Sequence, residues 1–110
     1  MKYISTRGQN SQKLSFNQIL LAGLAPDGGL YLPETYPQIS ADELQVLREA
    51  SQKSYSELAF LLLQKFIDSD DISAQDLRKI VEKTYTPQIY KYSRLPENAV
   101  QITPLTKINE

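Results

Sequence analysis

The sequence predicts an α+β fold, a four-helix cluster with two or three short strands that is mainly helical. Four segments place apolar residues at helical spacing, and each begins at a serine followed three positions later by Gln, Glu or Asp. The strand-like segments are short and do not alternate with the helices as βαβ units would. A chain of 110 residues has room for one domain with one modest core.

The first part of the chain predicts a strand, a loop and a helix. Residues 2–6 are aromatic, β-branched and hydroxyl-bearing, which suits a short strand, and the polar residues 8–13 suit a loop. Ser15 with Gln18 has the pattern of a capping box at the start of a helix. Gly23 is expected as the C-terminal cap of that helix.

A sharp turn is predicted at Pro26, Asp27, Gly28 and Gly29, followed by a strand at residues 30–32. Proline fixes φ at the first central position, aspartate can bond its own backbone, and the two glycines permit positive φ. A diglycine can also form a backbone nest that binds an anion. Because no helix N-terminus or lysine follows, as a phosphate site would require, the structural turn is the favoured interpretation.

Three further helices are expected in the middle of the chain. Their serine caps and acidic partners are Ser40 with Glu43, Ser54 with Glu57, and Ser73 with Asp76. Leu44 and Leu47, with Ala50 or Val46, are expected on the inner face of the first of these helices. The second is the most apolar and is predicted to run through Phe66, so it should be the central helix.

An acidic turn, a last helix and a third strand complete the expected elements. The carboxylates of Asp68–Asp71 lack the alternating spacing, the glycine and the closing glutamate of a calcium loop, so this run is predicted to be a solvated turn. The last helix is expected to carry Leu77, Ile80, Val81 and Thr84 at helical spacing and to stop at Pro87. Residues 100–103 alternate strictly between apolar and polar and predict the third strand.

Composition excludes several function classes. The chain has 12 Lys and Arg against 13 Asp and Glu, a net charge of -1, so it lacks the basic face of a nucleic-acid-binding protein. The longest apolar run, Leu58 to Leu63, is too short to span a bilayer, and no helix has a basic polar face for membrane binding. With no Cys and no His, thiol nucleophiles, Ser-His pairs and the strongest metal ligands are absent. We therefore predict no catalytic, cofactor-binding or metal-binding residue, and, without an apolar secretory signal, a cytoplasmic location.

Tyrosine is unusually frequent, with seven residues against three phenylalanines. Tyr85, Tyr90 and Tyr92 gather near the end of the chain, beside Ile89. Tyrosine combines an apolar ring with a polar hydroxyl and is common at protein interfaces. This cluster is therefore predicted to pack against other protein.

Three segments together resemble the N-terminal domain of the threonine synthase family. They are Met-Lys-Tyr-Ile-Ser-Thr-Arg-Gly at residues 1–8, the run at residues 15–34 that contains Gly-Leu-Ala-Pro-Asp-Gly-Gly-Leu-Tyr, and Ile-Thr-Pro-Leu at residues 102–105. The similarity covers essentially all 110 residues. It implies that residues 1–110 are one N-terminal domain, a fragment of a longer chain whose catalytic pyridoxal-phosphate domains are missing.

The resemblance implies the accessory domain of a pyridoxal-phosphate-dependent lyase that converts O-phospho-L-homoserine and water to L-threonine and phosphate in threonine biosynthesis. In this family the cofactor-binding lysine lies in a later segment similar to His-Gly-Pro-Thr-(two or three residues)-Lys-Asp, which this chain lacks. The fragment alone is expected to bind no pyridoxal phosphate and to be inactive. Its expected partners are the catalytic domains of its own chain, with O-phospho-L-homoserine as substrate of the full-length enzyme.

Because the domain has no chemistry of its own, we infer that it helps to shape or cover the active-site entrance of the complete enzyme. Asp27, Gly28 and Gly29 are the candidate structural turn near that entrance. Two other functions are left open by the sequence. One is a stand-alone protein-interaction module of the same fold. The other is the N-terminal domain of a threonine synthase-like phospho-lyase, which carries a similar opening.

Overall fold

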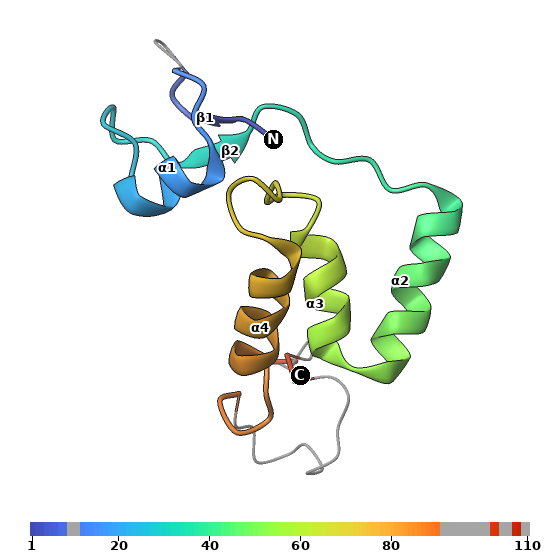
Figure 1. Ribbon diagram of the computed structural model, residues 1–110. Helices are drawn as coiled ribbons and strands as arrows, with labels where there is room; N and C mark the ends of the chain where they lie inside the picture. The colour runs from blue at the N-terminus through green and yellow to red at the C-terminus, as the bar shows by residue number, and fades with distance from the viewer. Residues whose placement is uncertain (9–11, 91–101, 104–106, 109–110) are drawn as a thin grey trace.

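A computed structural model describes residues 1–8, 12–90, 102–103 and 107–108 of the chain. Within these residues it contains four helices and one two-stranded antiparallel sheet, so the α+β class is confirmed. The elements in chain order are β1 (Tyr3–Ser5), α1 (Phe16–Ala22), β2 (Tyr31–Pro33), α2 (Ala41–Lys53), α3 (Tyr55–Leu63) and α4 (Ala74–Thr84). Figure 1 shows β1, α1 and β2 as a small unit at one side, and α2, α3 and α4 as an up-and-down helical cluster.

The sheet pairs β1 with β2 in a register that sets Ile4 opposite Leu32. The predicted strand at residues 30–32 begins one residue later in the structure. The reason is that the Leu30 N–H donates to the Thr6 hydroxyl at 2.9 Å rather than to a backbone carbonyl. A second connection was not predicted: Tyr3 and Leu14 exchange backbone hydrogen bonds of 2.8 and 3.1 Å on the other edge of β1.

Helix α1 begins and ends where its sequence pattern predicts. The Gln18 N–H donates to the Ser15 hydroxyl at 3.3 Å and the Ser15 N–H donates to the Gln18 side chain at 2.8 Å, which completes the capping box. Gly23 follows with a φ of 76°, and its N–H donates to the Ile19 carbonyl. None of the seven residues of α1 is fully buried, so local capping holds this helix more than core packing does.

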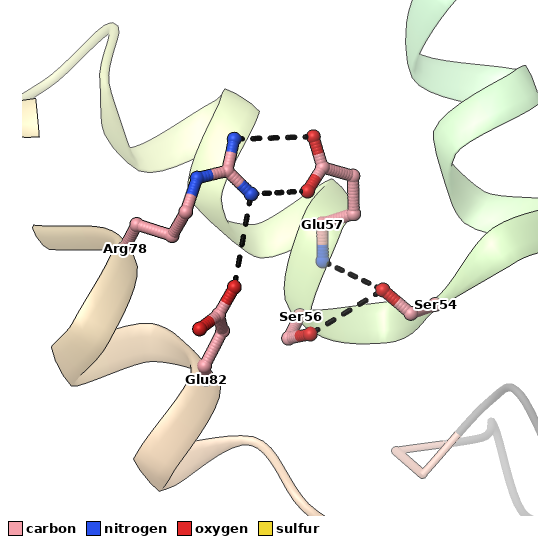
Figure 2. Close-up of polar contacts among 5 residues, drawn as sticks. All are labelled: Ser54, Ser56, Glu57, Arg78 and Glu82. Carbon is pink, nitrogen blue, oxygen red and sulfur yellow. Dashed lines mark hydrogen bonds and ion pairs between the residues drawn. The ribbon is translucent and has the colours of Figure 1, made fainter. Parts of the chain in front are cut away.

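Ser54 serves two helices at once. Its N–H donates to the Ala50 carbonyl at the end of α2, and its hydroxyl accepts from the Glu57 N–H at 3.0 Å at the start of α3. Because the Ser54 N–H is already bonded, the Glu57 carboxylate does not complete a capping box and is free to bind Arg78. Figure 2 shows this arrangement, with Ser56 3.3 Å from the Ser54 hydroxyl.

The helical cluster differs from the prediction at two points. On α2, Leu47 and Ala50 are buried as predicted, but Leu44 and Val46 are 42% and 53% exposed. Helix α3 ends at Leu63 rather than at Phe66, because i-to-i+3 hydrogen bonds tighten the chain into a turn after the helix. Helix α3 nevertheless lies between α2 and α4, as its apolar composition predicts (Figure 1).

The core lies between α3 and α4. Its buried residues are Phe60, Ile67, Leu77 and Val81. The guanidinium of Arg78 covers the Phe60 ring, 4.0 Å from the ring centroid. It is held there by Glu57 at 2.5 Å and by Glu82 at 3.8 Å, the two ion pairs that Figure 2 shows. The hydrogen bond from Arg78 is the main cause that lowers the pKa of the Glu57 carboxyl below its ordinary value.

The run at Asp68–Asp71 forms an exposed turn, as predicted, and it also contacts the β1-α1-β2 unit, which the sequence did not predict. Asp68 pairs with the Met1 ammonium group, and the Asp71 carbonyl accepts from the Asn17 side chain at 2.7 Å. Just before this turn, the Phe66 carbonyl accepts a hydrogen bond from the Tyr3 hydroxyl. Charge and hydrogen bonding together therefore fix how the two parts pack.

The C-terminal part of the described chain gives no support to a third strand. Helix α4 ends before Pro87 as predicted. Of the predicted strand at residues 100–103, positions 100 and 101 lie outside the described residues, while Ile102 and Thr103 form a bend. Ile102 is nevertheless buried. None of the helices in the described residues has the length and apolarity needed to cross a membrane.

Candidate functional site

The loop between α1 and β2 forms the turn that the sequence predicts. The Gly28 N–H donates to the Ala25 carbonyl at 2.9 Å, which places Pro26 and Asp27 at the two central positions. The Ala25 N–H donates to the Gly29 carbonyl at 3.0 Å and closes the base of the loop. Gly28 has a φ of 82°, which favours glycine.

Gly29 requires glycine for a different reason than Gly28. Gly28 is the one of the pair that uses the positive φ which the two glycines permit, whereas the φ of Gly29 is not positive. A Cβ at Gly29 would clash with the Ser5 hydroxyl oxygen and would lie 2.8 Å from the Thr6 hydroxyl oxygen. The absent side chain therefore permits the loop to approach the end of β1 closely.

Asp27 fixes the loop through its own carboxylate. One carboxylate oxygen accepts from the Ser5 hydroxyl at 2.7 Å and from the Gly29 N–H at 2.9 Å. These bonds, the one from Ser5 foremost, lower the pKa of the Asp27 carboxyl below its ordinary value. The Gly29 N–H that an anion nest would offer is thus occupied by the protein's own carboxylate, which favours the structural turn over the nest.

Arg7 is part of this site, although the sequence analysis did not single it out. Its guanidinium donates to the Asp27 carbonyl at 2.9 Å and lies against Gly28. The two residues are 20 positions apart, so no local pattern could have joined them. Two side chains on the β1 side therefore hold the loop. Arg7 bonds to the backbone carbonyl of Asp27, and Ser5 bonds to the Asp27 carboxylate.

Five exposed leucines flank the loop along the chain, and we call them the leucine face. Its members are Leu20, Leu21, Leu24, Leu30 and Leu32. Leu21, at 89% exposure, is the most exposed of the five, and Leu32, at 38%, is the least. Large exposed apolar patches are typical of surfaces that contact another protein.

The tyrosine cluster has partners inside the domain. Tyr85 and Tyr90 are half-buried and stack with ring centroids 5.7 Å apart, and Tyr55 packs against Tyr85 at 5.5 Å. Ile89 is exposed, and Tyr92 lies outside the described residues. Two of the predicted interface residues therefore already use their rings within the chain.

The described residues also form a groove of about 450 Å³ between α2 and α3. It is lined by Asp42, Glu43, Val46, Leu47, Leu61, Gln64 and Lys65. Glu43 and Lys65 pair at 2.6 Å at its edge, and the hydrogen bond from Lys65 is the main cause that lowers the pKa of the Glu43 carboxyl. Across the described part of the chain, His, Cys, Asp and Glu form no group of three that could hold a metal ion.

Comparison with known proteins gives a consistent result. The sequence model of the family described as "Threonine synthase N terminus" matches residues 2–85. Threonine synthase from Methylobacillus glycogenes is 56% identical over 110 residues, which are 100% of this chain and 22% of that protein. Threonine synthase from Corynebacterium glutamicum is 40% identical over 111 residues, with 100% of this chain and 21% of the relative covered.

A solved structure shares the fold as well. The crystal structure of threonine synthase from Brucella melitensis with bound pyridoxal phosphate (PLP) superposes with a TM-score of 0.69 and 39% identity. The match covers 97% of this chain and 20% of that one. The chain therefore spans about a fifth of the length of the relatives that it matches.

Proposed function

Because the chain belongs to the family of threonine synthase N-terminal domains, we propose that it serves a complete enzyme that converts O-phospho-L-homoserine and water to L-threonine and phosphate. The observation that carries the proposal is the 56% identity to a threonine synthase over 110 residues, all of this chain. Pyridoxal phosphate, when bound by the complete enzyme, supplies the electron sink for the chemistry. The proposal includes a cytoplasmic location for that enzyme.

Within this enzyme, we propose that residues 1–110 act as one N-terminal accessory domain and that the rest of the chain carries the reaction. The chain has no His and no Cys, which removes the side chains most used for proton transfer and nucleophilic attack. The polar groups of the loop around Asp27 bond to one another, as do Glu57 and Arg78. These contacts support a structural contribution, in which the domain packs against the catalytic domains.

The function can be tested by comparing the complete enzyme with the 110-residue domain. We expect the complete enzyme to form threonine and phosphate, and the domain alone to form neither. Borohydride reduction with pyridoxal phosphate should label one lysine stoichiometrically in the complete enzyme, beyond residue 110, and none in the domain. One dominant labelled lysine within residues 1–110 would contradict the assignment. Release of phosphate without threonine would instead favour the threonine synthase-like phospho-lyase.

We further propose that the turn at Asp27, Gly28 and Gly29 lies near the active-site entrance. The loop supports this because it is rigidly bonded yet presents an exposed carboxylate beside an apolar surface. The variant Asp27→Asn keeps an oxygen that can accept from Ser5 and Gly29, so the domain should unfold at an unchanged urea midpoint. If the charge acts at the entrance, kcat/KM of the complete enzyme should fall by about twofold to fivefold.

Asp70→Asn is the matched control, because Asp70 is an exposed carboxylate in the acidic turn, outside the loop that contains Asp27. It should change neither the midpoint nor kcat/KM. If the Asp27→Asn enzyme has the same kcat/KM as the unmodified enzyme, the charge of Asp27 has no role in catalysis.

A further inference from the structure

The leucine face begins on helix α1, none of whose residues is fully buried. Helix α1 has only seven residues, and isolated helices shorter than about 12 residues are marginal in water. Its capping box and glycine cap define its ends, yet Leu20 and Leu21 point away from the core at 61% and 89% exposure. A short helix with this much exposed leucine is expected to gain stability from a partner.

The five exposed leucines lie close together along the chain, on both sides of one turn. Leu20 and Leu21 are on α1, and Leu24 comes directly after the glycine that caps this helix. The hydrogen bond from the Ala25 N–H to the Gly29 carbonyl then brings Leu24 next to Leu30. Leu30 and Leu32 lie two positions apart along the β2 segment and so share one side of it.

We propose that the leucine face is the surface on which the remaining part of the same polypeptide docks. The proposal rests on the proposed function, in that it takes the remaining chain to be the catalytic part of a threonine synthase. The relatives are about five times as long as this chain, since the chain covers 22% of one and 20% of another. An accessory domain that is part of such a chain must bury a surface against the rest, and apolar surface is what such interfaces bury.

Two other surfaces fit this partner less well. Tyr85 and Tyr90 stack on each other, so docking there would have to displace contacts that already exist. The groove between α2 and α3 has the Glu43–Lys65 ion pair at its edge, and burying a charge pair is costly. The five leucines have no charge to desolvate. The nearby Asp27 carboxylate already accepts hydrogen bonds from Ser5 and Gly29.

The test measures how fast a cysteine on the leucine face reacts with iodoacetamide in the full-length protein. Residues 1–110 contain no natural cysteine, and peptide mass spectrometry separates the introduced one from any in the rest of the chain. Leu21→Cys is compared with Lys79→Cys on the polar face of α4, whose side chain is 68% exposed. Each native rate is divided by the rate in urea, which removes differences in intrinsic reactivity.

Docking predicts that Leu21→Cys reacts about tenfold more slowly than Lys79→Cys in the native full-length protein. Leu24→Cys is a second variant and should be protected in the same way. Equal rates at positions 21 and 79 would overturn the inference. Protection that appears only as protein concentration rises would also overturn it, because the occupant would then be a second copy of the chain.

Threonine formation by the unmodified full-length protein separates this inference from the proposed function. If the cysteines at positions 21 and 24 are protected but the protein forms no threonine, the docking surface is supported and the proposed function is wrong. Freely reacting positions in a protein that forms threonine would reject the docking surface and keep the function.

Discussion

Gly29→Ala is expected to lower the free energy of unfolding of the domain by about 2 kcal/mol. A Cβ at this position would clash with the Ser5 hydroxyl oxygen and would lie 2.8 Å from that of Thr6. Both hydroxyls can rotate away, but each would lose a hydrogen bond: Ser5 to Asp27 at 2.7 Å and Thr6 from Leu30 at 2.9 Å. Each lost bond costs about 1 kcal/mol. Urea unfolding followed by circular dichroism measures the change.

A double-mutant cycle shows whether the clash is the cause. Ser5→Ala removes the nearer hydroxyl, so Gly29→Ala should cost about 1 kcal/mol less in that background than alone. Gly28→Ala is the companion variant: there the nearest contact is the flexible end of Arg7, and the cost of about 1 kcal/mol comes from the φ of 82°. Strictly additive costs for Ser5→Ala and Gly29→Ala would disprove the close-approach explanation, as would a Gly29→Ala domain with an unchanged midpoint.

The helix ends could be predicted from the sequence because every group involved is local. Ser15 bonds to Gln18, Ser40 to Glu43, and Ser73 to the Asp76 N–H, each three residues on. The capping-box pattern was an incomplete guide at Glu57. The Ser54 N–H that the Glu57 side chain would accept from is bonded to Ala50, and Glu57 binds Arg78, 21 positions away. Local chemistry therefore fixed where helices start, while a long-range pair decided what Glu57 does.

The contacts that hold the two parts of the fold together could not be predicted in this way. Asn17 bonds to Asp71 across 54 positions, and Met1 pairs with Asp68 across 67. A carboxylate in a polar run has the same local pattern whether it faces water or a partner that arrives from elsewhere in the chain. Arg7 escaped prediction for the same reason, since nothing near it in sequence indicates its bond to Asp27.

Periodicity has a similar limit for the leucines of α1. The helical spacing of Phe16, Ile19 and Leu20 predicts an apolar face on α1, and this helix forms with Leu20 61% exposed. It does not reveal whether the face is buried inside the domain or against a partner, because both require the same spacing. The exposed fractions of the leucines supply this information. They favour an interface at the leucine face over the interface expected at the tyrosines near the end of the chain.

Phe60→Ala is expected to have the largest effect of any substitution considered, a loss of about 3–5 kcal/mol in the free energy of unfolding. Phe60 is 5% exposed at the contact between α3 and α4, where it packs with Leu77 and Val81. Truncation to alanine leaves a cavity and also removes the ring beneath Arg78, which lies 4.0 Å from its centroid. Small domains are stable by only about 5–15 kcal/mol, so this variant is expected to be largely unfolded at moderate urea concentrations.

Phe60→Leu keeps the fold measurable and separates the two contributions. Leucine fills most of the volume, so the expected loss is about 1–2 kcal/mol, of which the ring's contact with Arg78 accounts for about 0.5–1 kcal/mol. In an Arg78→Met background, where the cation is absent, Phe60→Leu should therefore cost less by that amount. Ile80→Ala on α4 is the control for a helix position outside the core: Ile80 is 51% exposed, and its loss should stay below about 1 kcal/mol. If Phe60→Ala destabilised the domain no more than Ile80→Ala does, the core would not lie between α3 and α4.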